Sequence, residues 1–289
     1  MADHKEDRGR SAGIDTSVCY GMVEKVFTTE RGDAMTDYRS NPLRRRLAAG
    51  EIGIVTLGFN SAEMCDFLGP MGFDAVFVDF EHGGVDWSEL SDISRACDLW
   101  DMGTAVRVPH IDEALILRAL DLGASSIIVP HCITPEQAER AARACRYPPE
   151  GNRGVAGNRR SYGASDYFHR ANEEVQCIAL IEDAAALDNL DAMLQVEGVD
   201  VFNVAPSDLA ASMGHIGNPG HPVVQQAIRD AIDTIVAAGR VAGTLVNDEN
   251  AQGFVAAGAR CLMVPWPRWV AAGASAFLGR IRSLSDTST

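Results

Sequence analysis

The sequence predicts an α/β fold in which eight parallel strands, each followed by a helix, close into a (β/α)8 barrel. Eight short apolar runs, rich in β-branched residues, occur between residues 52 and 265 and alternate with longer amphipathic segments. The runs are apolar almost without interruption, which is typical of parallel strands buried on both faces. The chain has 289 residues, and a barrel of this kind takes roughly 250. An open, doubly wound sheet is the alternative, because periodicity alone does not show closure.

The predicted elements follow one another in a regular order. A short helix is expected over residues 41–50, with a glycine at its C-terminal end. After the fourth strand, Thr134 suits the N-cap of a helix and Pro135 its first helical position. Gly239 is expected to end the helix after the sixth strand, and Asp248 to cap the helix after the seventh. The predicted strands are residues 52–57, 75–80, 104–108, 126–130, 177–182, 201–205, 241–246 and 261–265, and the helices that follow them are residues 61–69, 85–100, 112–123, 134–146, 184–194, 221–239, 248–258 and 266–284.

The composition argues against several classes of protein. Hydrophobic residues make up 46% of the chain and charged residues 22%, which are ordinary values for a globular protein. The formal net charge of −15 argues against a nucleic-acid partner and against an anionic membrane surface. No stretch reaches the roughly 18 apolar residues of a membrane-spanning helix. The polar N-terminus is unlike a secretory signal and the seven cysteines form no C-x-x-C pair, so a reduced, cytoplasmic protein is expected.

Residues 1–40 differ from the remainder of the chain. They are rich in Asp, Glu, Arg, Ser and Thr, and they show no sustained apolar period. We therefore expect two parts: an N-terminal extension over residues 1–40, mobile or loosely packed, and a barrel domain over residues 41–289.

Polar residues gather where the predicted strands end. In a (β/α)8 barrel the carboxyl ends of all strands meet at one face, and the loops that follow them build the active site. No GxGxxG motif follows the first strand and no P-loop is present, so a nucleotide site is poorly supported. The polar residues at the strand ends are Asp79, Glu81, His82, Arg107, His131, Glu182, Asp183, Ser207, Asp208 and Asn247.

Two of these carboxylates, Glu182 and Asp208, are candidates to hold one divalent cation. They follow neighbouring strands, and a hard cation such as Mg²⁺ is usually held by one or two carboxylates together with water and substrate oxygens. Asp208 has a second interpretation, because it also suits the N-cap of a helix over the following LAASMG residues.

Arg107 and His82 are further candidates. Arg107 ends an apolar strand, and a buried arginine needs an acidic partner. It could clamp an anion or a developing enolate, or it could form a structural ion pair with Asp79 or Asp121. His82 precedes two glycines that let a backbone approach a ligand, and histidine is the usual base near neutral pH. The plain alternative is a surface histidine, and His131 is the weaker candidate.

The ordered motifs of this chain resemble the HpcH/HpaI aldolase family. The motifs are VFVDFEHG, VRVP, DLGASSIIVP, RYPPEGNRGVAG, LIED and VAPSDLAASMGHIGNPGHP, and the resemblance covers roughly residues 42–282. It implies a TIM barrel of the phosphoenolpyruvate/pyruvate-domain type. It also implies a class II pyruvate aldolase that uses Mg²⁺, Mn²⁺ or Co²⁺ and acts on a small 2-oxo acid and an aldehyde. Family members are commonly homo-hexamers, dimers of trimers that exchange C-terminal helices between subunits.

The resemblance implies roles for individual residues. Glu182 and Asp208 are similar to the metal-binding carboxylates of the family. Arg107 is similar to the arginine that holds the pyruvate oxygen and the enolate. His82 is similar to the catalytic base, and Asp121 to the acid that orients this base.

The resemblance also implies a substrate pocket, in which this chain departs from the family. Asp79 is similar to the loop aspartate near the acceptor aldehyde. The backbone of Ala205, Ser207 and Asp208 is similar to the segment that receives the pyruvate carboxylate at a helix N-terminus. Ala205 and Ser207 stand where the family usually has Gly and Ala. Leu180 stands where many members have Gln, and strand alternation places it on the face of the metal-binding glutamate.

The implied activity is reversible cleavage of a 4-hydroxy-2-oxo acid into pyruvate and an aldehyde through a metal-stabilised enolate. No lysine for a Schiff base lies at a strand end. An oxaloacetate decarboxylase, or a CoA-ester lyase of the citrate lyase β or malyl-CoA lyase type, could use the same enolate. The CoA enzyme predicts a basic groove, and only Arg153, Arg159 and Arg160 form a dense basic group. A non-catalytic barrel that binds a small molecule predicts that the metal pair is broken.

Overall fold

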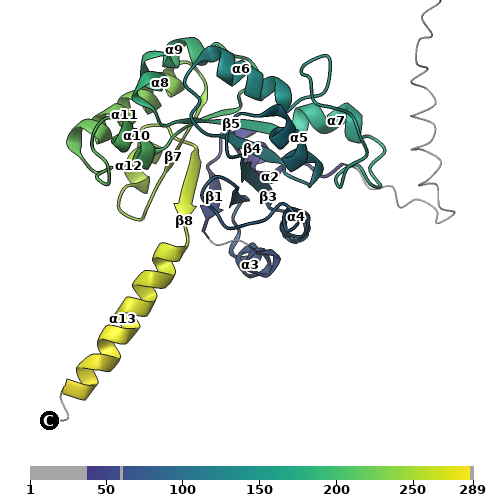
Figure 1. Cartoon of the computed structure of the whole chain (residues 1–289). Coiled ribbons are helices and arrows are strands. Elements are labelled where there is room, and N and C mark those ends of the chain that lie inside the picture. Colours follow the sequence, from purple (N-terminus) through teal and green to yellow (C-terminus); the bar gives the residue numbers. More distant parts are fainter. Residues whose placement is uncertain (1–37, 59–60, 287–289) are drawn as a thin grey trace, which may run out of the picture.

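The computed structural model describes residues 38–58 and 61–286, and it confirms the closed barrel (Figure 1). Eight parallel strands follow one another around the barrel in chain order, and β8 pairs with β1, which excludes the open sheet. Each strand lies within one residue of its predicted bounds. The strands are β1 (Gly53–Leu57), β2 (Ala75–Asp79), β3 (Gly103–Arg107), β4 (Ser126–Val129), β5 (Gln176–Ile181), β6 (Val201–Val204), β7 (Val241–Leu245) and β8 (Cys261–Pro265).

Strand residues alternate between the lumen of the barrel and the shell of helices around it. On β2, Phe77 belongs to the apolar cluster of the lumen, whereas Val76 and Val78 belong to the cluster beneath the helices. The same alternation continues past the last apolar residue of a strand. It therefore directs the polar residue at a strand end into the mouth of the barrel.

The helices of the shell agree with most of the predicted segments. Thr134 and Gln137 form a capping box at the start of α6, and Gly239 adopts φ +72° just after the end of α11. The prediction for Asp248 is wrong, because α12 begins after Asn250, whose side chain accepts from Asn247 N at 2.8 Å. The single helix predicted over residues 184–194 is two short helices. The helices are α3 (Ala62–Leu68), η1 (Gly69–Met71), α4 (Leu90–Leu99), α5 (Glu113–Asp121), α6 (Pro135–Ala144), α7 (Tyr167–Glu174), α8 (Ala184–Asp188), α9 (Leu190–Met193), α10 (Pro206–Ser212), α11 (Pro222–Ala237), α12 (Ala251–Ala256) and α13 (Pro267–Asp286).

Helix α2 (Pro42–Ala48), the predicted helix ahead of β1, closes the N-terminal end of the barrel. Its residues Leu43 and Leu47 join the apolar cluster of the lumen. They pack so closely on the start of β1 that a Cβ at Gly53 would lie 2.5 Å from Leu43 Cδ1. Helix α2 thus fills this end of the lumen, and the carboxyl ends of the strands lie at the other end.

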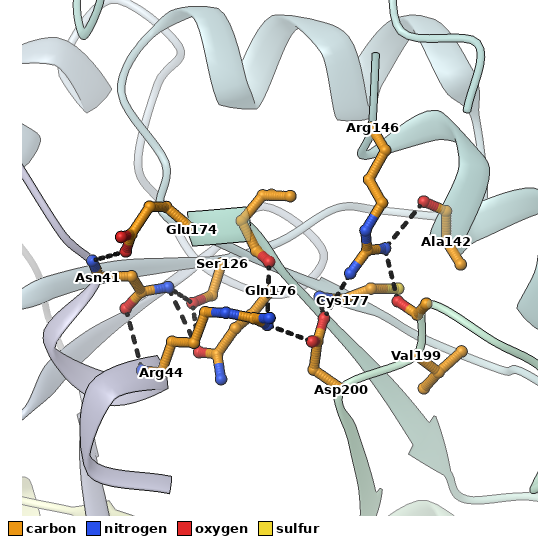
Figure 2. A network of polar contacts seen from close by, with 12 residues as sticks. Asn41, Arg44, Ser126, Ala142, Arg146, Glu174, Gln176, Cys177, Val199 and Asp200 are labelled. Atoms are coloured by element: carbon orange, nitrogen blue, oxygen red, sulfur yellow. Dashed lines mark hydrogen bonds and ion pairs between the residues drawn. The ribbon is translucent and has the colours of Figure 1, made fainter. Parts of the chain in front are cut away.

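A polar network fastens this closed end, and Asp200, just before β6, is its centre (Figure 2). The Asp200 carboxylate accepts hydrogen bonds from Cys177 N at 2.8 Å, from Arg146 Nη2 at 3.0 Å, and from Arg44 of α2. Arg146 Nη1 also donates to Gly198 O at 2.6 Å. Removal of this one carboxylate would take an acceptor from three donors. We therefore expect the network to stabilise the folded protein.

Asn41 ties α2 to two strands in the same network (Figure 2). Its Nδ2 donates to Ser126 Oγ of β4 and to Ser125 O, both at 3.0 Å, and lies 3.4 Å from Gln176 Oε1 of β5. Its backbone N–H donates to Glu174 Oε2 at 2.8 Å. Asn41 is thus both the N-cap of α2 and the residue that links this helix to β4 and β5.

The two ends of the described chain differ in how they pack. Tyr38 is buried against Tyr167 of α7, with ring centroids 5.1 Å apart, so packed structure begins slightly before residue 41. The extension predicted over residues 1–40 otherwise lies outside the described residues. Helix α13 projects away from the barrel (Figure 1), and its residues Val270, Phe277 and Ile281 are exposed. In the part of the chain that the structure describes, no helix combines the length and the apolar character needed to cross a bilayer.

Candidate active site

A cavity of about 630 Å³ opens at the carboxyl ends of the strands, as the barrel fold predicts. Its lining includes Asp79, His82, Arg107, Glu182 and Asp208, five of the residues that the sequence singled out. Asp79 and Arg107 end β2 and β3, His82 and Glu182 follow β2 and β5, and Asp208 lies in the first turn of α10. The structure therefore brings most of the predicted site together in one place.

Arg107, the last residue of β3, is held by two carboxylates from the strand next to it. Its Nε and Nη2 donate to the two oxygens of Asp79 at 2.9 and 2.7 Å, and its Nη1 lies 3.0 Å from Glu81 Oε2. Strand register places Asp79 directly beside Arg107. Of the two partners that the sequence left open, the structure selects Asp79 and not Asp121.

The ion pair determines the charge state of both partners. Burial would raise the pKa of Asp79, but the hydrogen bonds and charge of Arg107 overcome it and hold this pKa below its ordinary value. Burial works against the charge of Arg107 as well, but Asp79, Glu81 and Glu182 raise its pKa. The guanidinium is therefore a permanent cation in the wall of the cavity. Its side chain is only 12% exposed, which leaves few orientations open to it.

Glu182 and Asp208 form a pair of like charges with one carboxylate deeply buried. Glu182 is 1% exposed, and burial raises its pKa, with the nearby charge of Asp208 adding to the effect. Its Oε1 accepts the backbone N–H of His131 at 2.7 Å. Asp208 does not cap a helix, because it lies inside α10, whose N-cap is Ala205. That interpretation is excluded.

The donor chemistry of this pair fits a hard divalent cation. Two carboxylates with an open cavity in front of them leave positions for water and substrate oxygens, as Mg²⁺ requires. A bound cation would also remove the cost of holding Glu182 ionised beside another acid. Among the described residues no group of three or more His, Cys, Asp or Glu side chains is arranged around a metal position.

The N-terminus of α10 offers fewer donors than the sequence suggests. The Ala205 N–H is used by the sheet, since it donates to Ile181 O at 3.1 Å, and Pro206 has no N–H. Only Ser207 and Asp208 leave N–H groups in the first turn that the helix itself does not use. A carboxylate bound here would therefore contact two amides and not the three positions expected.

His82 and Asp121 are not brought together within one chain. His82 lines the cavity with its side chain 67% exposed, and its Nε2 lies 4.0 Å from Glu81 Oε2. Asp121 is the last residue of α5, near the start of β4, and pairs with Arg153 Nη2 at 2.8 Å. Because α5 runs back from the carboxyl end of β3, Asp121 lies at the opposite end of the barrel from His82.

Glu81, His131 and Asp183 contact the residues of the cavity or one another, and the sequence assigned them no role or only a weak one. His131 adopts φ +48°, a left-handed conformation, and its Nδ1 lies 2.9 Å from Asp183 Oδ2. This contact is the main reason why the pKa of His131 is raised. His131 Nε2 is also 3.8 Å from Glu81 Oε1. The sequence shows that Glu81, His131 and Asp183 follow strand ends. It does not show the contacts between them, because these contacts join three different loops.

The basic group that a CoA-binding groove would need is at the wrong end of the barrel. Arg159 and Arg160 pair with Asp98 at 2.6 and 3.3 Å, and Arg153 pairs with Asp121. All three arginines are at most 15% exposed in their side chains. They serve packing at the N-terminal end and do not form the basic groove that the CoA-ester lyase alternative predicts.

Comparison with known proteins agrees with this site. Residues 55–264 match the family model for HpcH/HpaI aldolase/citrate lyase. The chain belongs to this family, whose members are carbon–carbon lyases, and the resemblance predicted from its motifs is confirmed.

Curated relatives are named as aldolases. The chain is 43% identical over 227 residues to a 4-hydroxy-2-oxovalerate aldolase of Rhodococcus jostii, covering 76% of this chain and 87% of that one. It is 39% identical over 219 residues to a hydroxypyruvate/pyruvate aldolase of Pseudomonas aeruginosa, covering 74% and 82%. Among solved structures, a family protein from Burkholderia cenocepacia superposes with a TM-score of 0.79 at 32% identity, covering 84% of this chain and all of the other.

Proposed function

We propose that this protein is a divalent-metal-dependent aldolase, which cleaves a 4-hydroxy-2-oxo acid to pyruvate and an aldehyde or forms it from them. One observation carries the proposal: two carboxylates, one of them deeply buried, and a fixed arginine face the same cavity. The pair suits a cation, and the arginine suits an oxygen that becomes negative. Relatives named as pyruvate and hydroxypyruvate aldolases support the choice of reaction.

In this proposal Glu182 and Asp208 hold the cation, with Mg²⁺ or Mn²⁺ as the first candidates. When bound, the cation supplies Lewis-acid polarisation of the 2-oxo carbonyl. Arg107 stabilises the charge that develops on the same oxygen, because its guanidinium is already oriented by Asp79 and Glu81 and needs no rearrangement. The amides of Ser207 and Asp208, at a helix N-terminus, receive the carboxylate of the substrate.

Proton transfer is assigned to His82. Its imidazole is exposed to the cavity and makes no short contact among the described residues, so it is available to a substrate hydroxyl. Asp79 is proposed to lie near the acceptor aldehyde. Asp121 can orient His82 only from another subunit, because within one chain it lies at the other end of the barrel.

We further propose a homo-oligomer, a hexamer in the family pattern, in which α13 packs on the barrel of a neighbouring subunit. What supports this is the helix itself. Val270, Phe277, Leu278 and Ile281 are between 45% and 59% exposed, and an apolar surface of this kind on an extended helix usually marks an interface. Near its start the helix still touches its own barrel, where Trp269 stacks on Phe73.

The proposed function is tested without knowledge of the aldehyde. The protein is incubated with pyruvate in D₂O and the loss of methyl-proton signal is followed by NMR, with Mg²⁺, with Mn²⁺ and with EDTA. Exchange that depends on the metal is expected, because enolate formation removes a C3 proton reversibly. Absence of exchange with every divalent cation would refute pyruvate as the donor and would leave the decarboxylase and binding-protein alternatives.

A further inference from the structure

Asn203 is a buried polar residue of the cavity whose role neither the metal nor the ion pair explains. On β6, Phe202 and Val204 belong to the cluster beneath the helices, whereas Val201 belongs to the lumen. Alternation therefore directs Asn203 into the lumen, where it lines the cavity and is 1% exposed.

One polar atom of the Asn203 amide is buried without a hydrogen-bond partner among the described residues. This atom is Oδ1, and an unsatisfied buried polar atom of this kind is unusual in a folded protein. The neighbouring strand makes room for the amide, since Gly243 of β7 lies in register with Asn203. A Cβ at Gly243 would come within 2.6 Å of Asn203 Oδ1 and within 2.8 Å of the backbone oxygen of Cys261 on β8. A glycine inside a strand often marks such a close approach, so the position of the amide is built by two strands.

The surroundings of Asn203 in the cavity are apolar. The neighbours that share the lumen with it are Leu57, Phe77, Leu180, Leu245 and Met263. Leu180 is its register partner on β5, and this apolar side chain offers the amide no hydrogen bond.

Asn203 lies on the side of the cavity where the 2-oxo acid would bind. It precedes Asp208 on the same segment and is the register partner of the residue two before Glu182. β2, which carries Asp79 and leads to His82, lies four strands away around the eight-stranded barrel and so faces it from the opposite wall. The amide therefore adjoins the donor acid and not the aldehyde.

We propose that Asn203 is a specificity-determining residue that binds a hydroxyl group on C3 of the donor, so that the enzyme prefers a 3-hydroxy-2-oxo acid to pyruvate. This deepens the proposed function and rests on it. A hydroxyl group can donate to the amide oxygen or accept from the amide nitrogen, so it satisfies Asn203 in either orientation of the amide. The methyl group of pyruvate can do neither and leaves the amide unsatisfied.

The test compares two donors in one experiment. Rates of C3 proton exchange in D₂O are measured with Mn²⁺ for pyruvate and for 3-hydroxypyruvate, each corrected for exchange without protein. They are measured in the wild type, in Asn203→Leu, which keeps the number of side-chain heavy atoms and removes both polar ones, and in Gly243→Ala, whose Cβ would displace the amide without removing it. The pyruvate rate of each variant is its internal control for folding and metal binding.

We expect both variants to lower the ratio of the 3-hydroxypyruvate rate to the pyruvate rate by about tenfold, through a higher KM for 3-hydroxypyruvate. A ratio that changes by less than about twofold while pyruvate exchange persists would overturn the inference and leave the proposed function standing. Equal loss of both rates in folded variants would also overturn it, because the amide would then serve both donors alike. Absence of exchange with either donor in the wild type would instead overturn the proposed function itself.

Discussion

Two replacements of Arg107, by lysine and by alanine, distinguish the effect of its positive charge from the effect of the shape of its guanidinium group. Arg107 makes three contacts, two with the oxygens of Asp79 at 2.9 and 2.7 Å and one with Glu81 at 3.0 Å. A lysine at this position keeps the positive charge but has one nitrogen, so it cannot bridge both oxygens of Asp79 and also reach Glu81. An alanine removes the charge as well and leaves two carboxylates without their partner.

The expected magnitudes follow from these contacts. Loss of a preoriented donor to a developing oxyanion typically costs 10²–10³ in rate, or about 3–4 kcal/mol, and we expect this of Arg107→Ala. For Arg107→Lys we expect a smaller loss of rate, about tenfold. The positive charge remains, but the paired donors of the guanidinium group are lost. Arg107→Ala is also expected to destabilise the fold by about 3–5 kcal/mol, since side chains only 12% to 21% exposed lose their ion pair.

The assay is metal-dependent proton exchange of pyruvate in D₂O, with Mn²⁺ affinity measured alongside. Mn²⁺ binding is expected not to weaken in either variant, because Arg107 is a cation and not a ligand. Arg140→Ala is the matched control, since this arginine is 53% exposed and pairs with Glu113, and neither residue lines the cavity. Exchange by Arg107→Ala within threefold of the wild-type rate would refute the role assigned to this residue.

Three more predictions concern the metal pair and the closed end of the barrel. Glu182→Gln and Asp208→Asn are expected to abolish Mn²⁺ binding in calorimetry and to keep the circular dichroism of the wild type; tight binding by either would contradict the assignment. The raised pKa of Glu182 means that the folded state binds its proton more tightly than the unfolded state does. The metal-free protein should therefore lose stability relative to Glu182→Gln as the pH rises above about 4.5 and through the folded pKa, and parallel melting temperatures across that range would argue against it. Asp200→Ala is expected to lower the free energy of unfolding, measured in urea, by about 3–5 kcal/mol. Removal of the Asp101 carboxylate, which forms an exposed ion pair, is expected to lower it by at most about 1 kcal/mol. Equal losses in the two variants would contradict the stabilising role of the Asp200 network.

The barrel and much of its mouth could be predicted because they depend on local pattern. Apolar runs and helix signals are read along a few consecutive residues, and the rule that barrel strands end at one face converts sequence position into spatial position. This is why Asp79, Arg107, Glu182 and Asp208 were expected together, and the structure places all four around one cavity.

Contacts between distant loops were not predictable in this way. The pairing of His131 with Asp183, and of Glu81 with Arg107, depends on side-chain directions that only the closed barrel sets. Asp121 differs from these pairs, because it stands near the end of a helix that the sequence predicted. The barrel rule alone therefore already implies that it is remote from His82 in the same chain.

The sequence by itself determined the eight strands, their order and the identity of the acids, the arginine and the histidine at their ends, because hydrophobic period and chain order are properties of the chain alone. The tertiary structure decided which of these groups touch and which are left unsatisfied. Asn203 illustrates the difference. In the sequence it is a single polar residue in an apolar run. The surroundings of its side chain depend on Leu180 on one neighbouring strand and on Gly243 on the other. Strands that are neighbours in a sheet are separated by whole helices in the chain, so the space around a lumen side chain exists only after the barrel has closed.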